Sequence, residues 1–520
     1  MSSTSESPHA RTREATRRRR RRSTPLAPQR HSDYRQLRNT LPRAGVLTGD
    51  QIEAIQESAL KVLRELGIRI LLPEARECLR AAGATVDEAT ALVKLEPELV
   101  LKALDLAPRN IEVTAADASR TLHLGGDHLY FGAGAGCPNV TDLDRGRHPG
   151  TLETFREFIK LQQHFDIIHK LGPSVEPQDI PIHLRHYAMM RSQMQLSDKV
   201  PFIYSRGRRQ VLDSFEMLRL ARGLSEEQFR ATPRTMTVIN SNSPRQLDIP
   251  MSRGIMDFAE WGQVSVITPF CLAGAMAPIT IAGALALSHA EALVGITLAQ
   301  SVRPGAPVVY GAFSSNVDMR SGAPVFGTPE HARTNFAAGQ LARHIGLPWR
   351  SGAGSAANAP DIQGASETQF AVWSCVLAGA HLVFHSAGWL EGGLTVSCEK
   401  FITDVEVLQM LAETLVPVPC ESEDIAFEAI GAVEPGGHFF GAEHTMSRYS
   451  TQFYEPLVWD WSNYGQWREA GAASTAQVAN GVWKKALEDF EPPPLDSANL
   501  EAMEDFIARR IEAGGAPIDG

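Results

Sequence analysis

The 520-residue chain has few cysteines, and their spacing fits neither a disulfide framework nor a structural zinc site. All six are isolated in the sequence, at positions Cys78, Cys137, Cys271, Cys375, Cys398 and Cys420. Scattered thiols are typical of a reducing compartment, so we expect a cytoplasmic protein. Histidines, cysteines and acids are nowhere grouped at metal-ligand spacing, so we expect no bound metal of the protein's own.

The chain also lacks an unbroken apolar run of membrane-spanning length. Residues 264–290 carry no charged side chain, but Pro269, Gly274, Pro278 and Gly283 interrupt them. A strand, a glycine-rich loop and a buried helix explain this composition better than a membrane span. We therefore expect no membrane partner.

Positive charge is scarce outside the N-terminus. The chain has 50 Lys and Arg against 60 Asp and Glu, a net charge of −10, yet residues 1–42 hold eleven arginines and three acids. That arm carries +8, which leaves −18 on the remaining residues. The acidic body has no zinc-finger or RNA-binding signature, so we expect a disordered, solvated arm over 1–42 and no nucleic-acid partner. No apolar segment follows the arginines, as an export signal would require.

From residue 128 onward, short apolar runs alternate with helical patterns. Eight runs begin at residues 128, 167, 201, 235, 264, 307, 347 and 381, which gives about 36 residues for each strand, helix and pair of loops. Eight such units over 128–415 predict an α/β fold, specifically a (β/α)8 TIM barrel. A doubly wound open sheet is the alternative, but no dinucleotide fingerprint follows an early strand, and the glycines of 131–136 do not open a helix.

Segments on either side of these units have other patterns. Thr48 and Gln51 form a capping box before apolar residues at helical spacing, so we expect a mainly helical N-terminal addition over 43–127. Residues 416–490 are rich in aromatic residues and histidine, and we expect them to form a C-terminal cap on the barrel. Residues 491–520 are expected to be a peripheral tail.

Active sites of such barrels lie at the carboxyl ends of the strands. The residues at or just after the ends of the runs are Glu176, Ser205, Arg206, Asn240, Asn242, Phe270, Phe313, Asn316, Asp318, Ser351, Ser355, Asn358, Asp361, His385, Trp389 and Glu391. A Schiff-base lysine is not among them, because Lys170 lies inside its run and Lys199 and Lys400 lie near helix ends. Aromatic rings with amides and a few carboxylates suit an organic cation.

Several of these residues also have a structural interpretation. Trp349 and Trp389 could serve as barrel packing, and His385 could be a hydrogen-bonded structural histidine. Glu330 follows Thr328 and Pro329, where an acid stabilises the first turn of a helix. The small residues of 351–361 suit either a flexible loop or a close approach to a ligand.

Taken in order along the chain, several segments resemble the trimethylamine methyltransferase superfamily, the corrinoid-dependent methylamine and betaine methyltransferases. They are residues 140–153, 278–300, 304–330, 349–367 and 377–406, the LRELGIRI segment ending at Ile70, and the region of His444 and Trp467. The resemblance implies a (β/α)8 barrel. In the trimethylamine enzymes a pyrrolysine follows the seventh strand, whereas here that place holds Ala357, Asn358 and Ala359. The chain is thus similar to the non-pyrrolysine branch, which demethylates quaternary amines such as glycine betaine.

The resemblance also implies a mechanism and partners. A separate corrinoid (cobalamin) protein docks at the barrel mouth, its Co(I) takes one N-methyl group, and dimethylglycine is released. No general acid is required, since a quaternary ammonium leaves as a neutral amine. We expect a homo-oligomer. The alternatives are another methyl donor (carnitine, proline betaine, trimethylamine or a sulfonium compound) or a non-catalytic binding homologue.

The roles expected of individual residues come from their positions at the strand ends and from their side-chain chemistry, and Asn358 is placed by the resemblance. We expect the cation end of the substrate at Phe313, Trp349, His385, Trp389 and Glu391, and the carboxylate at Arg206 or the backbone amides of 352–358. Glu176, Tyr204 and Glu330 are expected to contribute to substrate binding. Asn358 and His385 are the expected catalytic residues.

Overall fold

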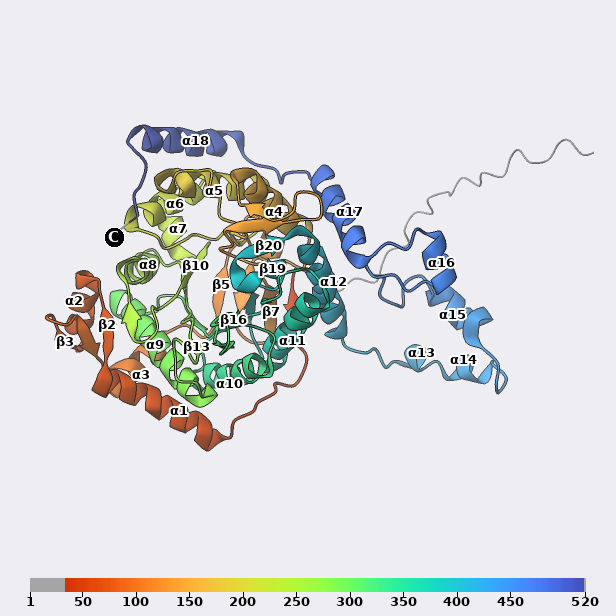
Figure 1. Cartoon of the computed structure of the whole chain (residues 1–520), viewed down its shortest axis with the longest axis horizontal. Helices are drawn as coiled ribbons and strands as arrows, with labels where there is room; N and C mark the ends of the chain where they lie inside the picture. The colour runs from red at the N-terminus through yellow and green to blue at the C-terminus, as the bar shows by residue number, and fades with distance from the viewer. Residues whose placement is uncertain (1–32, 519–520) are drawn as a thin grey trace, which may run out of the picture. The chain divides into compact units, whose positions relative to one another are not determined.

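The computed structural model describes residues 33–518, so the arginine run and most of the expected N-terminal arm lie outside the described residues. Contacts divide the chain into two compact units. Among the described residues, the main unit contains 33–417 and 456–518, and the smaller unit contains 418–455. Figure 1 shows the elements of both units, which are described separately below.

The main unit is a mixed α/β structure built on a largely parallel sheet. Its seven strands are, in sheet order, β1 (Leu37–Arg38), β7 (His128–Phe131), β18 (Leu382–Phe384), β17 (Trp349–Gly352), β14 (Val308–Gly311), β12 (Val264–Ile267) and β10 (Met236–Ile239). All neighbours from β7 to β10 pair in parallel, and β1 is antiparallel to β7. β12, β14 and β17 are buried along their whole length; β12 and β14 are mainly apolar, as buried parallel strands usually are, whereas β17 carries Arg350 and Ser351.

Isolated parallel β-bridges extend the parallel pairing beyond β7 at one end and β10 at the other. Gly132, just after β7, bridges to Lys170, Lys170 bridges to Val200, and Phe202 bridges to Met236 in β10. Residues 167–171 and 200–203 therefore lie between β7 and β10 at two of the predicted strand positions. All eight runs expected from the sequence take part in parallel pairing.

Helices surround the strands (Figure 1), and all eight expected helices are present. They are α4 (Leu152–His164), α5 (Ile182–Leu196), α6 (Arg208–Ala221), α8 (Ile249–Glu260), α9 (Ile281–Val302), α10 (Pro329–Ile345), α11 (Ile362–Ala378) and α12 (Cys398–Thr414), with the short α7 (Glu226–Ala231) after α6. Thr151, Thr280 and Thr328 cap their helices through side-chain oxygens. Gly346 and Gly379 end α10 and α11 in the left-handed conformation.

One described helix, α9, is long and apolar enough to cross a membrane by length and composition. It is 78% buried over its most apolar window, and it packs against α8, α10 and the N-terminal helices. β12, a loop with β13 (Leu272–Ala273), and α9 occupy the stretch expected to hold a strand, a loop and a buried helix. A core position accounts for the composition of α9.

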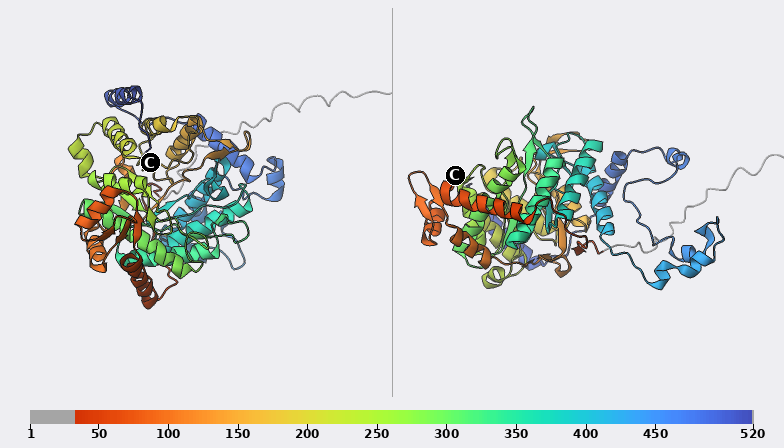
Figure 2. Two further views of the ribbon diagram at one scale, coloured as in Figure 1. Left: turned by 60° about the vertical axis from the view of Figure 1, so that its left-hand side comes forward. Right: turned by 90° about the horizontal axis from the view of Figure 1, so that it is seen from below.

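The N-terminal addition is mixed and contains more strands than expected. Its helices are α1 (Gly49–Lys61), continued by the π-helical η1 (Val62–Leu66), α2 (Pro73–Ala81) and α3 (Pro97–Leu106); its strands are β2 (Ile68–Ile70), β3 (Thr85–Asp87), β4 (Leu92–Lys94), β5 (Ile111–Val113) and β6 (Leu122–Leu124), with η2 at Ala118–Arg120. The predicted capping box of Thr48 and Gln51 is present. β2 also pairs with β11 (Gln246–Leu247), and α1 packs along α9 and α10 (Figure 2).

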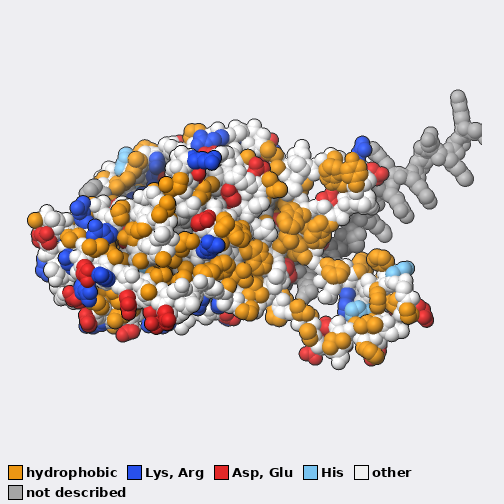
Figure 3. Space-filling model, turned by 60° about the horizontal axis from the view of Figure 1, so that its bottom comes forward, with side chains coloured by type: hydrophobic (Ala, Val, Ile, Leu, Met, Phe, Trp, Pro, Cys, Tyr) orange, Lys and Arg blue, Asp and Glu red, His pale blue; other side chains and the backbone are white. Residues whose placement is uncertain are grey.

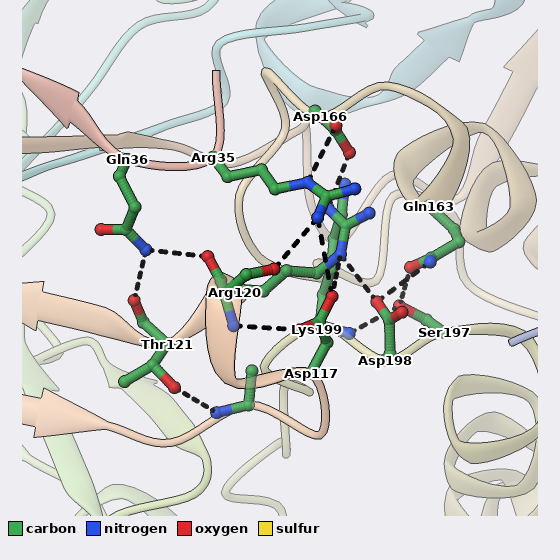
Figure 4. Close-up of polar contacts among 12 residues, drawn as sticks. Arg35, Gln36, Asp117, Arg120, Thr121, Gln163, Asp166, Ser197, Asp198 and Lys199 are labelled. Carbon is green, nitrogen blue, oxygen red and sulfur yellow. Dashed lines mark hydrogen bonds and ion pairs between the residues drawn. The ribbon is translucent and has the colours of Figure 1, made fainter. Parts of the chain in front are cut away.

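The expected disordered arm does not extend to residue 42. β1 pairs with β7, and Arg35 forms an ion pair of 3.0 Å with Asp166. Arg120 lies between Asp166 and Asp198 at 2.8 and 2.9 Å, so these charges form the connected network of Figure 4. Placing 33–42 in a solvated arm was wrong, because these carboxylates give Arg35 a fixed partner and β7 gives this segment a strand to pair with.

The C-terminal region is divided between the two units. α16 (Tyr464–Glu469), α17 (Thr475–Glu488) and α18 (Ser497–Glu512) belong to the main unit, where α17 packs on α12 and α18 packs on α6. The smaller unit holds α13 (Ser422–Ile425), α14 (Phe427–Gly431), η4 (Phe439–Gly441) and α15 (Glu443–Arg448). A cap over 416–490 stays a prediction, although residues 456–490 group with the main unit rather than with 418–455.

The surface of the main unit carries both signs of charge. On the face drawn in Figure 3, acidic and basic side chains are interspersed among hydrophobic ones, and that face shows no continuous basic patch. The absence of a nucleic-acid partner stays a prediction.

Candidate active site

The loops after the parallel strands surround a cavity of about 530 Å³. Two small sheets shape these loops. The first contains β13, β15 (Ser315–Val317) and β16 (Pro324–Val325). The second contains β19 (Trp389–Leu390), β20 (Thr395–Ser397), β8 (Asn139–Thr141) and β9 (His148–Pro149), and η3 (Glu391–Gly393) lies between β19 and β20 in the sequence. A larger hollow of about 770 Å³ lies within residues 422–448, but it is lined mainly by exposed side chains. The 530 Å³ cavity lies at the carboxyl ends of the parallel strands, where an active site was expected from the sequence.

One side of the cavity is an aromatic wall, made of Phe270, Phe313, His385 and Trp389. The Phe313 ring centroid lies 5.4 Å from that of Phe270 and 5.8 Å from that of Trp389. His385 stacks on Trp389 at 4.2 Å with an interplanar angle of 17°. The rings fix one another in place, so they offer a preformed surface to a ligand.

The glycines of the loop 351–361 pack against this wall. A Cβ on Gly352 would lie 2.7 Å from the Phe313 ring, and a Cβ on Gly354, where φ is +127°, would overlap the Trp389 ring. Gly393, on the other side, also leaves no room for a Cβ beside Trp389. The small residues of this loop therefore allow aromatic rings to approach the backbone closely. The sequence had suggested either a flexible loop or a close approach to a ligand.

This contact gives a prediction for Gly354→Ala. The added methyl group must displace the Trp389 ring, and alanine is also strained at φ +127°. We expect the KM for the methyl donor to rise at least about tenfold, as a misplaced binding group predicts. Steady-state kinetics measures it. Gly481→Ala is the matched control, since nothing lies within 4 Å of its Cβ position; equal kinetics in the two variants would contradict the role of Trp389.

Two cationic side chains come from the strands themselves. Lys170 and Arg350, here called the buried cation pair, are 2% and 1% exposed and both line the cavity. The Lys170 Nζ lies 4.1 Å from the Phe384 ring centroid, and the Arg350 Cζ lies 4.6 Å from it. Burial, with a smaller contribution from Arg350, lowers the pKa of Lys170 to about 7. Burial lowers the pKa of Arg350 to about 9, so it stays charged at pH 7.

The buried cation pair lacks anionic partners among residues 33–518. Lys170 makes no hydrogen bond or ion pair there, and the Nε and Nη1 of Arg350 have no acceptor. No described acidic side chain lines the cavity. Buried charges are normally paired, so two unpaired cations facing one cavity are an exception that calls for a functional explanation.

His385 links the cation pair to the aromatic wall. The Nη2 of Arg350 donates to the Nε2 of His385 over 3.0 Å. A guanidinium can only donate, so His385 must carry its proton on Nδ1. Burial, Arg350 and Lys170 together hold the pKa of His385 well below its usual value, so the ring is neutral. Its Nδ1 has no partner among the described residues, and its φ of 57° is unusual for a residue other than glycine.

Arg206 is differently placed from the buried cation pair. Its Cζ lies 3.8 Å from the Tyr204 ring centroid, and its guanidinium is ion-paired with Glu176. Arg185 reaches the same carboxylate at 3.2 Å. Burial alone would raise the pKa of Glu176, but Arg206 and Arg185 lower it on balance. Arg206 therefore already has a carboxylate partner, which it shares with Arg185, unlike Lys170 and Arg350.

The residues expected from the sequence fall into two groups. Eight of them line the cavity: Tyr204, Ser205, Arg206, Asn240, Phe270, Phe313, His385 and Trp389. Asn358 and Glu330 are exposed and do not line it, and Glu391 forms an ion pair of 3.0 Å with Arg147. Trp349 is buried against Gly339 of α10, on the helix side of β17. Glu176 contacts the cavity only through Arg206.

Lys170 and Arg350 were not predicted as site residues, because they lie inside their strand segments and the prediction was restricted to strand ends. Side chains alternate along a strand, so Trp349 and Ser351 face α10 while Arg350 faces the cavity. In both segments, 167–173 and 347–352, a charged residue within a mainly apolar strand was the feature of the sequence that could have identified these two residues. Phe202 and Phe384 were missed for the same reason.

Comparisons with known proteins give a consistent result. The family model "Trimethylamine methyltransferase (MTTB)" matches residues 11–515. A glycine betaine methyltransferase of Desulfitobacterium hafniense is 35% identical over 472 residues, covering 90% of this chain and 98% of that protein. A trimethylamine methyltransferase of Methanosarcina mazei is 28% identical over 486 residues, covering 90% and 95%. The crystal structure of a monomethylamine methyltransferase of Methanosarcina barkeri aligns at a TM-score of 0.44 with 10% identity, covering 88% and 97%.

Proposed function

The chain belongs to the trimethylamine methyltransferase family, and we propose that it moves an N-methyl group from a quaternary amine, glycine betaine first of all, to a corrinoid on a partner protein. Dimethylglycine is the second product. The 35% identity to a glycine betaine methyltransferase over nearly the whole chain supports this choice of donor.

The observation that carries the proposal is the aromatic wall beside a cavity without acidic side chains. Ring faces attract an N-trimethyl group, and each contact contributes about 0.5–2 kcal/mol in a desolvated site. Phe270, Phe313 and Trp389 can surround such a group on one side. The volume of about 530 Å³ is typical of small-molecule sites and leaves room for a methyl acceptor to approach.

The reaction needs little from the protein beyond orientation and exclusion of water. When a corrinoid in the Co(I) state is present, it supplies the electron pair that forms the new bond to the methyl carbon. The C–N bond breaks, its electrons stay on nitrogen, and the leaving amine is neutral. No proton moves, which agrees with a neutral His385 and with the lack of an acid in the cavity. The chain's own residues would hold the ammonium against the wall and direct one methyl group outward.

We further propose that the sheet is a closed (β/α)8 barrel. Eight surrounding helices support this, as do the bridges that connect β7 to β10 through Lys170, Val200 and Phe202. A corrinoid carrier protein as partner, a homo-oligomeric state and a cytoplasmic location are part of the same proposal. None of the described His, Cys, Asp and Glu residues form a group that could hold a metal ion.

The proposal is tested by incubating the purified protein with reduced cobalamin or its corrinoid carrier and glycine betaine. We expect a methyl-cobalt absorption band to appear together with an equal amount of dimethylglycine. Carnitine and proline betaine serve as alternative carboxylated donors, and trimethylamine as one without a carboxylate. If none of the carboxylated quaternary amines gives product, the proposed function is wrong.

Glu391→Gln should change little. Its carboxylate pairs with Arg147, and this pair is too exposed to contribute more than about 1 kcal/mol. We therefore expect kcat and KM for the methyl donor within about threefold of the wild type, in contrast with the cation-binding role expected from the sequence. Steady-state rates of dimethylglycine formation measure this. A rise in KM of about tenfold or more would return Glu391 to the substrate site.

A further inference from the structure

The buried cation pair is the feature of the cavity that the methyl-transfer chemistry leaves unused. Removing charged groups from water costs several kcal/mol unless they gain a partner. Lys170 and Arg350 are almost fully buried, and residues 33–518 provide neither with a carboxylate. An anion that enters the cavity would give both of them a partner.

The geometry favours one shared anion. Both cations contact the Phe384 ring, at 4.1 and 4.6 Å from its centroid, and both line the same cavity. Each also lowers the pKa of His385, which places both charges near that ring. The Nε and Nη1 of Arg350 have no acceptor, and the Nζ of Lys170 lies over the Phe384 ring that Arg350 also contacts. Together these donors match the two oxygens of a carboxylate.

The aromatic wall lies on the other side of the same groups. The Arg350 Cζ is 5.2 Å from the Phe313 centroid, and His385 connects Arg350 to Trp389 through its hydrogen bond and its stacking contact. An anion held by Lys170 and Arg350 would therefore have the cation-binding rings as near neighbours. This spacing suits a small zwitterion whose carboxylate and ammonium are separated by one or a few carbon atoms.

We propose that Lys170 and Arg350 form a carboxylate-binding subsite, which selects carboxylated quaternary amines against purely cationic ones such as choline. This inference rests on the proposed function for the identity of the ammonium end. It replaces Arg206 as the carboxylate ligand, because Arg206 already has a carboxylate partner in Glu176. A purely cationic ligand would meet two unpaired positive charges and would leave both of them without partners.

The subsite also predicts proton uptake when the carboxylate binds. The free Lys170 has a pKa of about 7, so at pH 8 it is mostly neutral, and an adjacent carboxylate favours its charged form. The other charged or titratable groups facing it are Arg350, which stays charged, the neutral His385, and the mutually paired Arg206 and Glu176. Lys170 is thus the group expected to take up the proton.

Binding without turnover tests the subsite. Isothermal titration calorimetry with the full chain, without any corrinoid, would compare glycine betaine, dimethylglycine, choline and propionate. We expect choline to bind at least about 30-fold more weakly than glycine betaine, and the Lys170→Met and Arg350→Met variants to lose at least about 30-fold in betaine affinity. Choline affinity should stay the same or improve in both variants, and Lys170→Arg should recover part of the loss.

The number of protons taken up on binding is a second measurement, and a lysine with only a structural role would not change it. At pH 8, titrations in two buffers of different ionisation enthalpy should show close to one proton taken up per betaine bound, and none in Lys170→Met. At pH 6 the wild type should take up none. Equal betaine affinity in the wild type and both methionine variants, or no uptake at pH 8, would overturn the subsite.

The two proposals can fail separately. If carboxylates bind in a manner that depends on Lys170 and Arg350 but no methyl group is transferred, the subsite stands and the proposed reaction is wrong. If glycine betaine is demethylated while the methionine variants bind it normally, the reaction stands and the subsite is wrong. Circular dichroism of each variant confirms that a lost affinity does not reflect a lost fold.

Discussion

Replacing Lys170 by methionine should make the ligand-free protein more stable at pH 6, by about 1–3 kcal/mol of unfolding free energy. The folded-state pKa of about 7 lies below the unfolded value of 10.5, so at pH 6 folding confines a charged ammonium in an apolar site. Between pH 7 and 10.5 the unfolded chain holds more protons than the folded one, and the wild type should gain stability as the pH rises. The methionine variant should lack this gain, so the two should converge near pH 10.

Chemical denaturation at several pH values measures this prediction. Lys199→Met is the informative comparison, because Lys199 is equally buried but donates to the backbone oxygens of Gln162, Phe165 and Ile168. Removing it leaves these carbonyls without their partner and should destabilise the protein at every pH. If Lys170→Met were as destabilising as Lys199→Met at pH 6, Lys170 would be a structural residue and the electrostatic account would be wrong.

Replacing Trp389 by leucine should raise the KM for the methyl donor by about 10- to 100-fold. The ring is part of the aromatic wall, and its loss removes a cation–π contact and loosens Phe313 and His385, which pack on it. We expect the binding of propionate to change much less than that of glycine betaine, because the carboxylate subsite is left in place. Kinetics and calorimetric titration of the same variant test both parts.

Trp349→Leu is the matched control for this prediction. Both tryptophans are buried and both were candidates for the substrate cation, but Trp349 lies against Gly339 of α10 on the opposite side of β17. Trp349→Leu should lower the unfolding free energy through the cavity it creates, while the KM stays near the wild-type value. Equal rises in KM for the two variants would contradict the assignment of Trp389 to the wall.

Much of the fold could be predicted because its periodicity is regular. The alternation of buried strands and capped helices located eight strand positions and eight helices, and the Thr48 capping box was correct. The strands of the N-terminal addition were harder to find, because three-residue strands such as β2 and β4 carry too few residues to show alternation. Order at Arg35 was not predicted because its partners Asp117 and Asp166 are 82 and 131 residues away in the sequence.

The candidate site was only partly accessible from the sequence. Aromatic and histidine residues at strand ends, such as Phe313 and His385, were found because the fold class places them there. Arg350 was not, because both faces of a parallel strand are buried, so hydrophobicity does not reveal which residues point inward. Asn358 was a candidate through the resemblance, and Glu330 was expected to contribute to substrate binding, but both are exposed. Which side chain of a strand faces the cavity depends on how neighbouring strands and helices pack on it.

The ratio of kcat/KM for glycine betaine to that for choline tests the account most directly. The two molecules share the trimethylammonium group and differ in the carboxylate, so the ratio isolates what the buried cation pair contributes to methyl transfer. We predict a preference for glycine betaine of about 10²–10⁴ at pH 7 with the wild-type protein and its corrinoid acceptor, and a preference reduced at least about 30-fold in Arg350→Met. Equal or faster demethylation of choline or trimethylamine by the wild type would contradict the account.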